Sequence, residues 1–303
     1  MTKMLGTKKP EIVYEFPEGD LEKIERLLKS EGDGKPEKDT EEVEQQPVIK
    51  SVEFDIKDKK DYILLEGKTH ESYEYPSLLI SKYRLSYNPE IKQAADNIGL
   101  NLADTAKEAN GRKYIGNIQW NSALKLNLCL NRLTLNSRQY IDFINLLRSG
   151  KAFNGEKNKI DTKELENILK EILELRDPWR FEWLDADFKY LDNNGNQVES
   201  SKKGDLWIYN NHILDANGNL IPKNKEKLKS YLMEDCKIDL STCNKNGMPM
   251  TKGNDINYWC PRKDNNSVAR FFAGSVGASL DCNGDPLYSY SGLGVRSAKI
   301  FEE

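Results

Sequence analysis

The chain has 303 residues, a formal net charge of -4 and 38% hydrophobic residues, which is enough for one large domain or two small ones. No stretch approaches the ~18 consecutive apolar residues that a membrane span needs, and no apolar run follows the basic start. We therefore expect a soluble protein without a signal peptide and without membrane insertion, located in the cytoplasm, in a virion or at a surface. Interspersed charges of both signs argue against a nucleic-acid partner.

Residues 1–48 are expected to form a flexible N-terminal extension. Residues 20–31 place apolar side chains at helical spacing, and residues 32–47 combine Gly, Pro and charge without a large apolar cluster. Residues 49–112 are expected to form an elaboration of strands and a helix. Alternation predicts the strands, which span residues 48–56, 61–67 and 75–87, and the helix spans residues 89–109.

Three helices are expected next, over residues 117–133, 135–150 and 161–175. The second begins near Asn136 or Ser137 and stops at Gly150, and its apolar face is predicted to be Tyr140, Ile141, Ile144 and Leu147. The third opens with Asp161 three residues before Glu164, the spacing of a capping box, and Pro178 is expected to end it.

After Pro178 the apolar period changes from 3.6 to 2, which predicts strands over residues 180–191 and 205–214. An Asn-Gly dipeptide follows each of them and indicates a hairpin turn. A short helix is expected over residues 225–235, and short strands with long loops follow from Asn254. Together these elements predict a mixed α+β fold.

Several motifs are weighed and set aside. Residues 192–203 have the Asp-x-Asn-x-Asn spacing of a calcium loop but lack its Gly and Glu, so a turn is preferred. Residues 274–279 lack the Lys-Ser/Thr pair of a phosphate loop. Asp185 and Asp187 share a strand face, as acidic pairs do by chance in so acidic a chain. No constellation of nucleophile and base stands out, so we expect no enzyme, no cofactor and no metal.

The five cysteines have no CxxC spacing and are expected to be reduced, although a disulfide between Cys260 and Cys282 is conceivable. The two histidines, His70 and His212, are expected to be ordinary polar residues.

The C-terminal tail differs in composition from the rest of the chain. Residues 271–292 set Phe and Tyr among Ser, Gly and Asn, the mixture that antibody-type binding loops use for rigid contact and adaptable hydrogen bonding. Residues 264–298 also contain no Lys, Glu, Gln, Met or Trp, the five amino acids that have no codon ending in a pyrimidine.

Residues 259–299 resemble the C-terminal region of C-type-lectin-fold variable proteins of diversity-generating retroelements, in particular the archaeal and archaeal-virus branch. Residues 293–296, "LGVR", resemble the strand that ends that fold, and residues 177–188 resemble its "PWR.EWLDA.F" segment. Residues 118–144 more loosely resemble the related formylglycine-generating-type domain. Together these matches cover roughly residues 113–303.

The resemblance implies a C-type lectin-like domain over residues 113–303, with a hypervariable region at about 264–298 rewritten by retroelement mutagenesis of adenines. It implies non-catalytic binding of a protein or cell-surface ligand. Val268, Phe271, Leu280, Cys282, Leu293 and Val295 are expected in the core. The ligand-binding residues expected to face outward are Phe272, Gly274, Val276, Gly277, Ser279, Asp281, Asn283, Leu287, Tyr288, Ser289, Tyr290 and Gly292. The alternatives are a copper-dependent oxidase using Cys260 and Cys282, and a structural or assembly protein.

Overall fold

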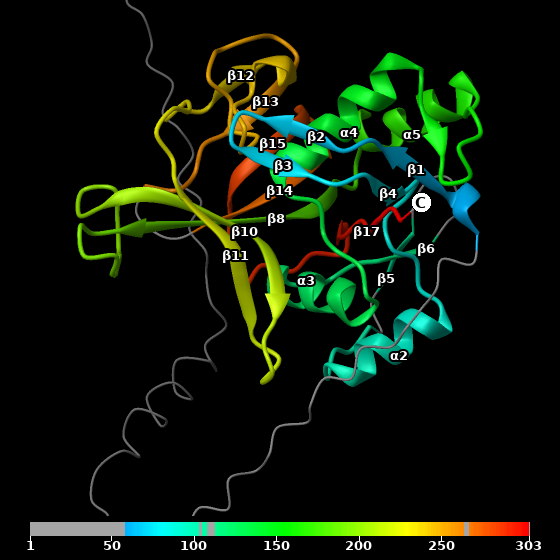
Figure 1. Cartoon of the computed structure of the whole chain (residues 1–303), viewed down its shortest axis with the longest axis horizontal. Helices are drawn as coiled ribbons and strands as arrows, with labels where there is room; N and C mark the ends of the chain where they lie inside the picture. The colour runs from blue at the N-terminus through cyan, green and yellow to red at the C-terminus, as the bar shows by residue number, and fades with distance from the viewer. Residues whose placement is uncertain (1–57, 103–104, 108–112, 264–266, 303) are drawn as a thin grey trace, which may run out of the picture. The chain divides into compact units, whose positions relative to one another are not determined.

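The computed structural model describes residues 58–102, 105–107, 113–263 and 267–302, all within one compact unit, Gln46–Glu303. The extension expected over residues 1–48 and the strand expected over residues 48–56 lie outside the described residues. Helices accompany a larger amount of β-structure, which confirms the predicted α+β class (Figure 1). Within the described residues, no helix is long and apolar enough to span a membrane.

The largest sheet has nine strands in the order β11-β10-β8-β14-β15-β13-β12, with β9 and β16 also paired to β8. The strands are β8 (Arg180–Leu191), β9 (Gln197–Val198), β10 (Asp205–Leu214), β11 (Leu220–Lys227), β12 (Cys236–Ile238), β13 (Ile256–Trp259), β14 (Ser267–Gly274), β15 (Gly277–Gly284) and β16 (Leu293–Gly294). β8 pairs with β14 and β10 in antiparallel fashion and with β16 in parallel fashion. Its bounds and those of β10 agree with the predicted strands.

The predicted Asn-Gly turns close the hairpins that follow β8 and β10. In the first turn the Asp192 carboxylate accepts hydrogen bonds from the backbone N–H groups of Asn194 and Asn196, both at 2.8–2.9 Å. Gly195 has a φ of 82°, in the left-handed region that glycine adopts at little cost. Residues 215–219 repeat these bonds. The segment after β8 therefore forms the predicted turn.

A four-stranded sheet joins the two ends of the described chain. Its order is β17-β4-β1-β7, and Ala298 of the C-terminal strand lies opposite Ile80. The strands are β1 (Tyr62–Leu65), β4 (Leu78–Ser81), β7 (Phe153–Asn154) and β17 (Ala298–Ile300), and two small hairpins are formed by β2 (Lys68–His70) with β3 (Tyr73–Tyr75) and by β5 (Thr105–Lys107) with β6 (Lys113–Ile115). The N-terminal strands therefore share a sheet and a core with the C-terminal segment, and Figure 1 shows β17 beside β4.

Three of the expected helices form where the sequence places them. The helices are α2 (Pro89–Asn97), α3 (Trp120–Cys129), α4 (Ser137–Ser149) and α5 (Thr162–Leu173), with short 3-10 turns η1 (Lys59–Asp61) and η2 (Leu240–Thr242). α4 has the full capping box of Asn136 and Gln139 and ends at Gly150, whose φ is 65°. At α5, Asp161 accepts a hydrogen bond from the N–H of Lys163 rather than from that of Glu164, so the capping box expected there does not form, and the helix ends at Leu173, before the predicted stop.

Two helix predictions are wrong. The helix expected over residues 89–109 ends at Asn97, because Gly99 adopts a φ of 67° and the chain then enters β5. The helix expected over residues 225–235 does not form. Its first residues extend β11, since the long hairpin with β10 keeps its register as far as Lys227.

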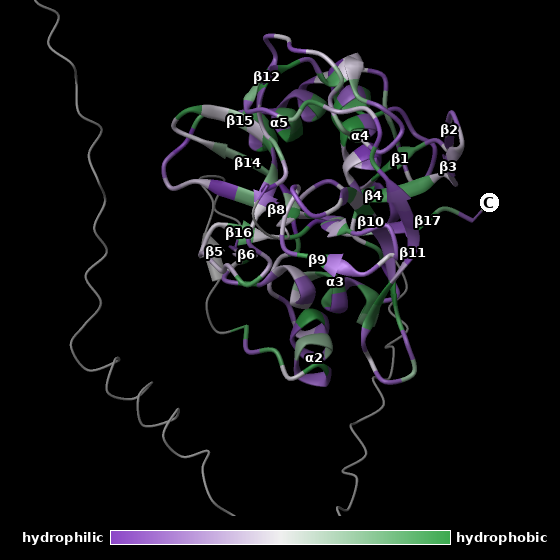
Figure 2. Cartoon of the chain, turned by 90° about the vertical axis from the view of Figure 1, so that its left-hand side faces the viewer, coloured by the Kyte–Doolittle hydropathy of each residue, from purple (hydrophilic) through white to green (hydrophobic). Residues whose placement is uncertain are grey.

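The core lies on both faces of the large sheet. Phe271 and Leu280 belong to a cluster that also contains the buried residues of α4 and α5. Phe181, Trp183 and Phe272 belong to a second cluster with residues of α2 and α3. Figure 2 shows hydrophobic and hydrophilic residues side by side on α2, as expected for a helix that covers one face of a core. The six residues predicted as core are all at most 1% exposed.

Candidate functional site

One face of the large sheet carries an arginine among aromatic side chains. Arg270 on β14 lies opposite Asp281 on β15 and Trp183 on β8, and Phe272 lies opposite Phe181 on β8. Because side chains of directly opposed residues project to the same face, these five form one continuous surface. The loop of residues 285–292 approaches this surface.

Arg270 links the sheet to that loop. Its Nε donates a hydrogen bond of 2.7 Å to Oδ2 of Asp281, and its guanidinium lies 4.9 Å from the ring centre of Phe181 and 5.7 Å from that of Tyr288. Burial raises the pKa of the Asp281 carboxyl, and the charge of Arg270 opposes that rise. The charge of Arg270 therefore already has a counter-ion beneath the loop.

Trp179, which precedes β8, forms an exposed aromatic platform at the edge of this face. It is 41% exposed and stacks on Phe272, with 5.9 Å between ring centres and 12° between planes. A Cβ on Gly274 would lie 3.0 Å from the indole, and one on Gly292 would lie 2.1 Å from the carbonyl oxygen of Trp179. Both glycines therefore make room for the tryptophan.

A hollow of about 420 Å³ lies between this platform and the loop, and we call it the aromatic pocket. Its lining comprises Asp177, Trp179, Phe181, Arg270, Asn283, Asp285, Tyr288 and Tyr290. Within the described residues, Asp177 and Asp285 have no ion-pair partner. The pocket thus combines aromatic walls with two unpaired carboxylates.

The structure divides the twelve predicted ligand-binding residues into three groups. The exposed ones are Val276, Leu287, Tyr288 and Ser289, the partly exposed ones are Gly277, Asn283 and Tyr290, and the buried ones are Phe272, Gly274, Ser279, Asp281 and Gly292. The expectation that all twelve face outward is wrong for the buried five. Trp179 stacks on Phe272 and lies against Gly274 and Gly292. Arg270 binds the Asp281 carboxylate. Ser279 lies between its larger neighbours Phe272 and Asn257.

The pocket brings together Asn283, Tyr288 and Tyr290 from the predicted set. Sequence reasoning missed Asp177, Trp179, Arg270 and Asp285 as lining residues. A signal for Arg270 was available, since it shares parity with Phe272 along β14. No local pattern identifies Trp179, because its place depends on two glycines far away in sequence.

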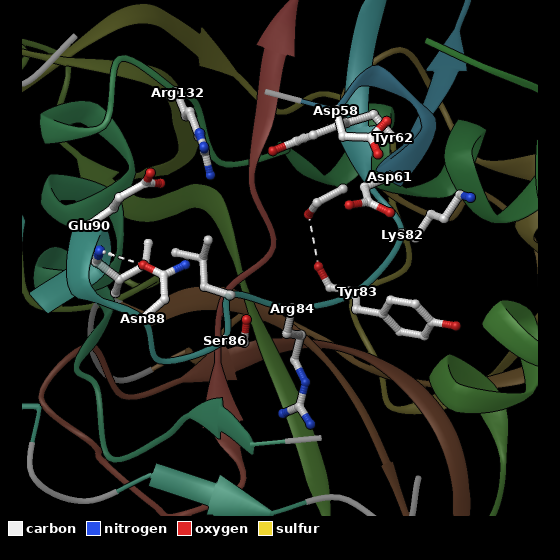
Figure 3. A pocket seen from close by; sticks show the side chains of 13 residues that line it. Asp58, Asp61, Tyr62, Lys82, Tyr83, Arg84, Ser86, Asn88, Glu90 and Arg132 are labelled. Carbon is white, nitrogen blue, oxygen red and sulfur yellow. Dashed lines mark hydrogen bonds between the residues drawn. The ribbon is translucent and has the colours of Figure 1, made fainter. Parts of the chain in front are cut away.

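A second hollow of about 300 Å³ lies near β1 and α2 (Figure 3). Its lining includes Asp61, Tyr62, Glu90 and Arg132. Burial raises the pKa of the Tyr62 hydroxyl, Arg132 lowers it, and the carboxylates of Asp61 and Glu90 raise it further. Charges of both signs meet here, and none of the predicted site residues takes part.

The carboxylate pair considered from the sequence has structural partners. Asp185 accepts a hydrogen bond of 2.9 Å from the backbone N–H of His212 and lies 2.5 Å from Nδ1 of the same residue. Asp187 forms an ion pair of 3.0 Å with Lys189. Both carboxylates are buried, and no nucleophile accompanies them in these contacts.

All five cysteines, each within the described residues, are free. Burial, followed by the neighbouring Asp235, raises the pKa of the Cys260 thiol to about 11, and burial raises that of Cys282. Both thiols are therefore less easily ionised than a free cysteine. Among the described residues, no group of three or more His, Cys, Asp or Glu side chains could hold a metal ion.

No family model matches the chain, and no curated protein or solved structure matches it.

Proposed function

We propose that this chain is a non-catalytic binding protein that recognises a protein or cell-surface ligand through the aromatic pocket and the exposed loop residues beside it. We further propose that it has a C-type lectin-like fold and that retroelement mutagenesis rewrites this surface. The proposal stands on the resemblance of residues 259–299, on the restricted amino-acid usage of residues 264–298 and on the geometry of the pocket.

The observation that carries the proposal is the contrast between the loop and the strands beneath it. Leu287 and Tyr288 are 69% and 46% exposed, whereas Leu293, a few residues later, is completely buried. Large exposed apolar side chains on a soluble domain mark interaction sites when they gather in one place. Here Tyr288 lines a hollow whose floor is a packed sheet, and Leu287 precedes it in the same loop, so exposed side chains can change without loss of the scaffold.

The fold proposal has support at the C-terminal strand. Residues 293–296 enter the core beside β8, and Arg296 is 2% exposed between Glu182 and the backbone carbonyl groups of β4 and Lys82. A segment that resembles the closing strand of the lectin-like fold thus occupies a buried, closing position.

A surface-display library tests whether the pocket region can be rewritten. We expect that NNY codons at Val276, Leu287, Tyr288 and Ser289 leave most variants folded, because these side chains contribute little buried area. The measurement is the fraction of displayed variants that resist protease, followed by selection for binding to a panel of purified proteins.

The matched control library randomises four of the buried residues, Phe272, Gly274, Asp281 and Gly292, in the same way. We expect most of its variants to be cleaved, since these positions form the support of the pocket. Equal survival of the two libraries, or survivors of the first library that yield no selectable binders, would contradict the proposed function.

A further inference from the structure

We infer that the aromatic pocket takes a basic side chain, arginine or lysine, of the protein ligand. This inference rests on the proposed function and specifies the chemistry of the group that enters the pocket.

The charge of the lining favours a cation. Asp177, Asp285 and the Arg270–Asp281 pair give the pocket a formal charge of about -2 when all carboxyls are ionised. Arg270 is neutralised by Asp281 at 2.7 Å, so the other two carboxylates set the sign of the potential at the mouth. An anionic ligand would meet both of them.

The aromatic walls favour the same ligand. The faces of tryptophan and tyrosine rings attract cations, and the effect grows when the site is partly shielded from water. Trp179 presents an exposed indole whose other face is stacked on Phe272, which fixes its orientation. Tyr290 is held edge-on against Phe181, with 5.8 Å between ring centres. A guanidinium or ammonium group entering here meets preorganised rings and two carboxylates.

The residues that line the pocket come partly from outside and partly from within the segment 264–298. Asp177 and Trp179 lie outside residues 264–298, whereas Asn283, Asp285 and Tyr288 lie within them. If the tail is rewritten, the first pair stays constant. We therefore expect Asp177 and Trp179 to bind a basic side chain that different ligands share. The loop residues would contact the ligand surface around that side chain and discriminate between ligands.

The test uses the full chain and two pairs of blocked tripeptides at low salt. In one pair arginine is replaced by citrulline, and in the other lysine is replaced by norleucine, so that only the charge and its hydrogen bonds change. We expect the basic peptide of each pair to bind about tenfold more tightly by calorimetry or ligand-observed NMR, and more weakly as salt rises.

Variants assign the preference to the pocket. Asp177→Asn and Asp285→Asn should each remove most of the preference, and the double variant should remove it. Asparagine keeps the oxygen with which Asp285 accepts the N–H of Leu287, so the loop retains its turn. Glu166→Gln, at an exposed position on α5 outside the lining, is the control and should leave the preference unchanged.

Three results would overturn the inference: equal binding of charged and neutral peptides, a preference that survives in the double variant, or no binding of either basic peptide up to about 10 mM. Tighter saturable binding of a neutral methyl glycoside would instead identify a carbohydrate pocket. An invariant tail in the source population would contradict the proposed diversification and leave the measured cation preference standing, so the two failures are distinguishable.

Discussion

Replacing Glu182 by glutamine is expected to lower the free energy of unfolding by about 3–5 kcal/mol, because it leaves buried positive charge without a counter-charge. The Glu182 side chain is completely buried and accepts hydrogen bonds from Arg180 and from Nη2 of Arg296, the latter at 2.7 Å. Glu171 and Arg84 complete the cluster, which therefore contains three arginines and two glutamates. Without Glu182, Glu171 alone faces all three arginines. Chemical denaturation of the two proteins measures the difference.

The pH dependence of the stability difference tests whether the charge of Glu182 is its cause. Arg180 and Arg296 overcome the burial penalty and lower the pKa of Glu182 to about 2. A carboxyl whose pKa is depressed on folding stabilises above its unfolded pKa of about 4.3 and loses that contribution as the pH falls toward the folded value. The difference in the free energy of unfolding between the wild-type protein and the variant should therefore become smaller as the pH falls from 5 to 2. A loss below about 1 kcal/mol at pH 7, or a gap that does not change with pH, would contradict this account.

Replacing Leu293 by alanine is expected to destabilise the protein by about 2–5 kcal/mol, because it opens a cavity in the core beside β8. Leu293 is completely buried and pairs with Phe181 across the sheet. The measurement is again the free energy of unfolding from denaturant titration.

The same substitution at Leu287 is the matched control. That side chain is 69% exposed, so we expect a change within about 0.5 kcal/mol. If Leu287→Ala were as destabilising as Leu293→Ala, the loop would be part of the core rather than a surface for a ligand.

The features that the sequence predicted well depend on local signals. The predicted start near Asn136 or Ser137 and the predicted stop at Gly150 define α4 within a few residues, since caps act on the helix end that contains them. The period-2 alternation from Arg180 to Leu191 predicts a strand, and β8 has those bounds. The alternation of Phe271, Leu280 and Cys282 toward the core also depends only on the period of a strand.

The features that it missed depend on contacts between distant segments. Residues 225–235 have helical spacing, yet pairing with β10 holds their first part in β11. Gly274 resembles a binding-loop glycine until Trp179 is seen to lie against it. Asp281 alternates outward as predicted, but Arg270 and the loop cover it. Strand parity assigns a side chain to a face of the sheet and leaves open what covers that face.

Deep sequencing of the last ~150 bases of the gene and its flanking DNA, in the source population, tests the central claim most directly. This length encodes the last 50 or so residues, which include 264–298. We predict substitutions confined to NNY codons, concentrated at exposed positions such as Val276, Leu287, Tyr288 and Ser289, beside a near-copy that carries AAY codons. An invariant 3′ end without a nearby copy would contradict diversification of the aromatic pocket and leave a protein with one fixed ligand.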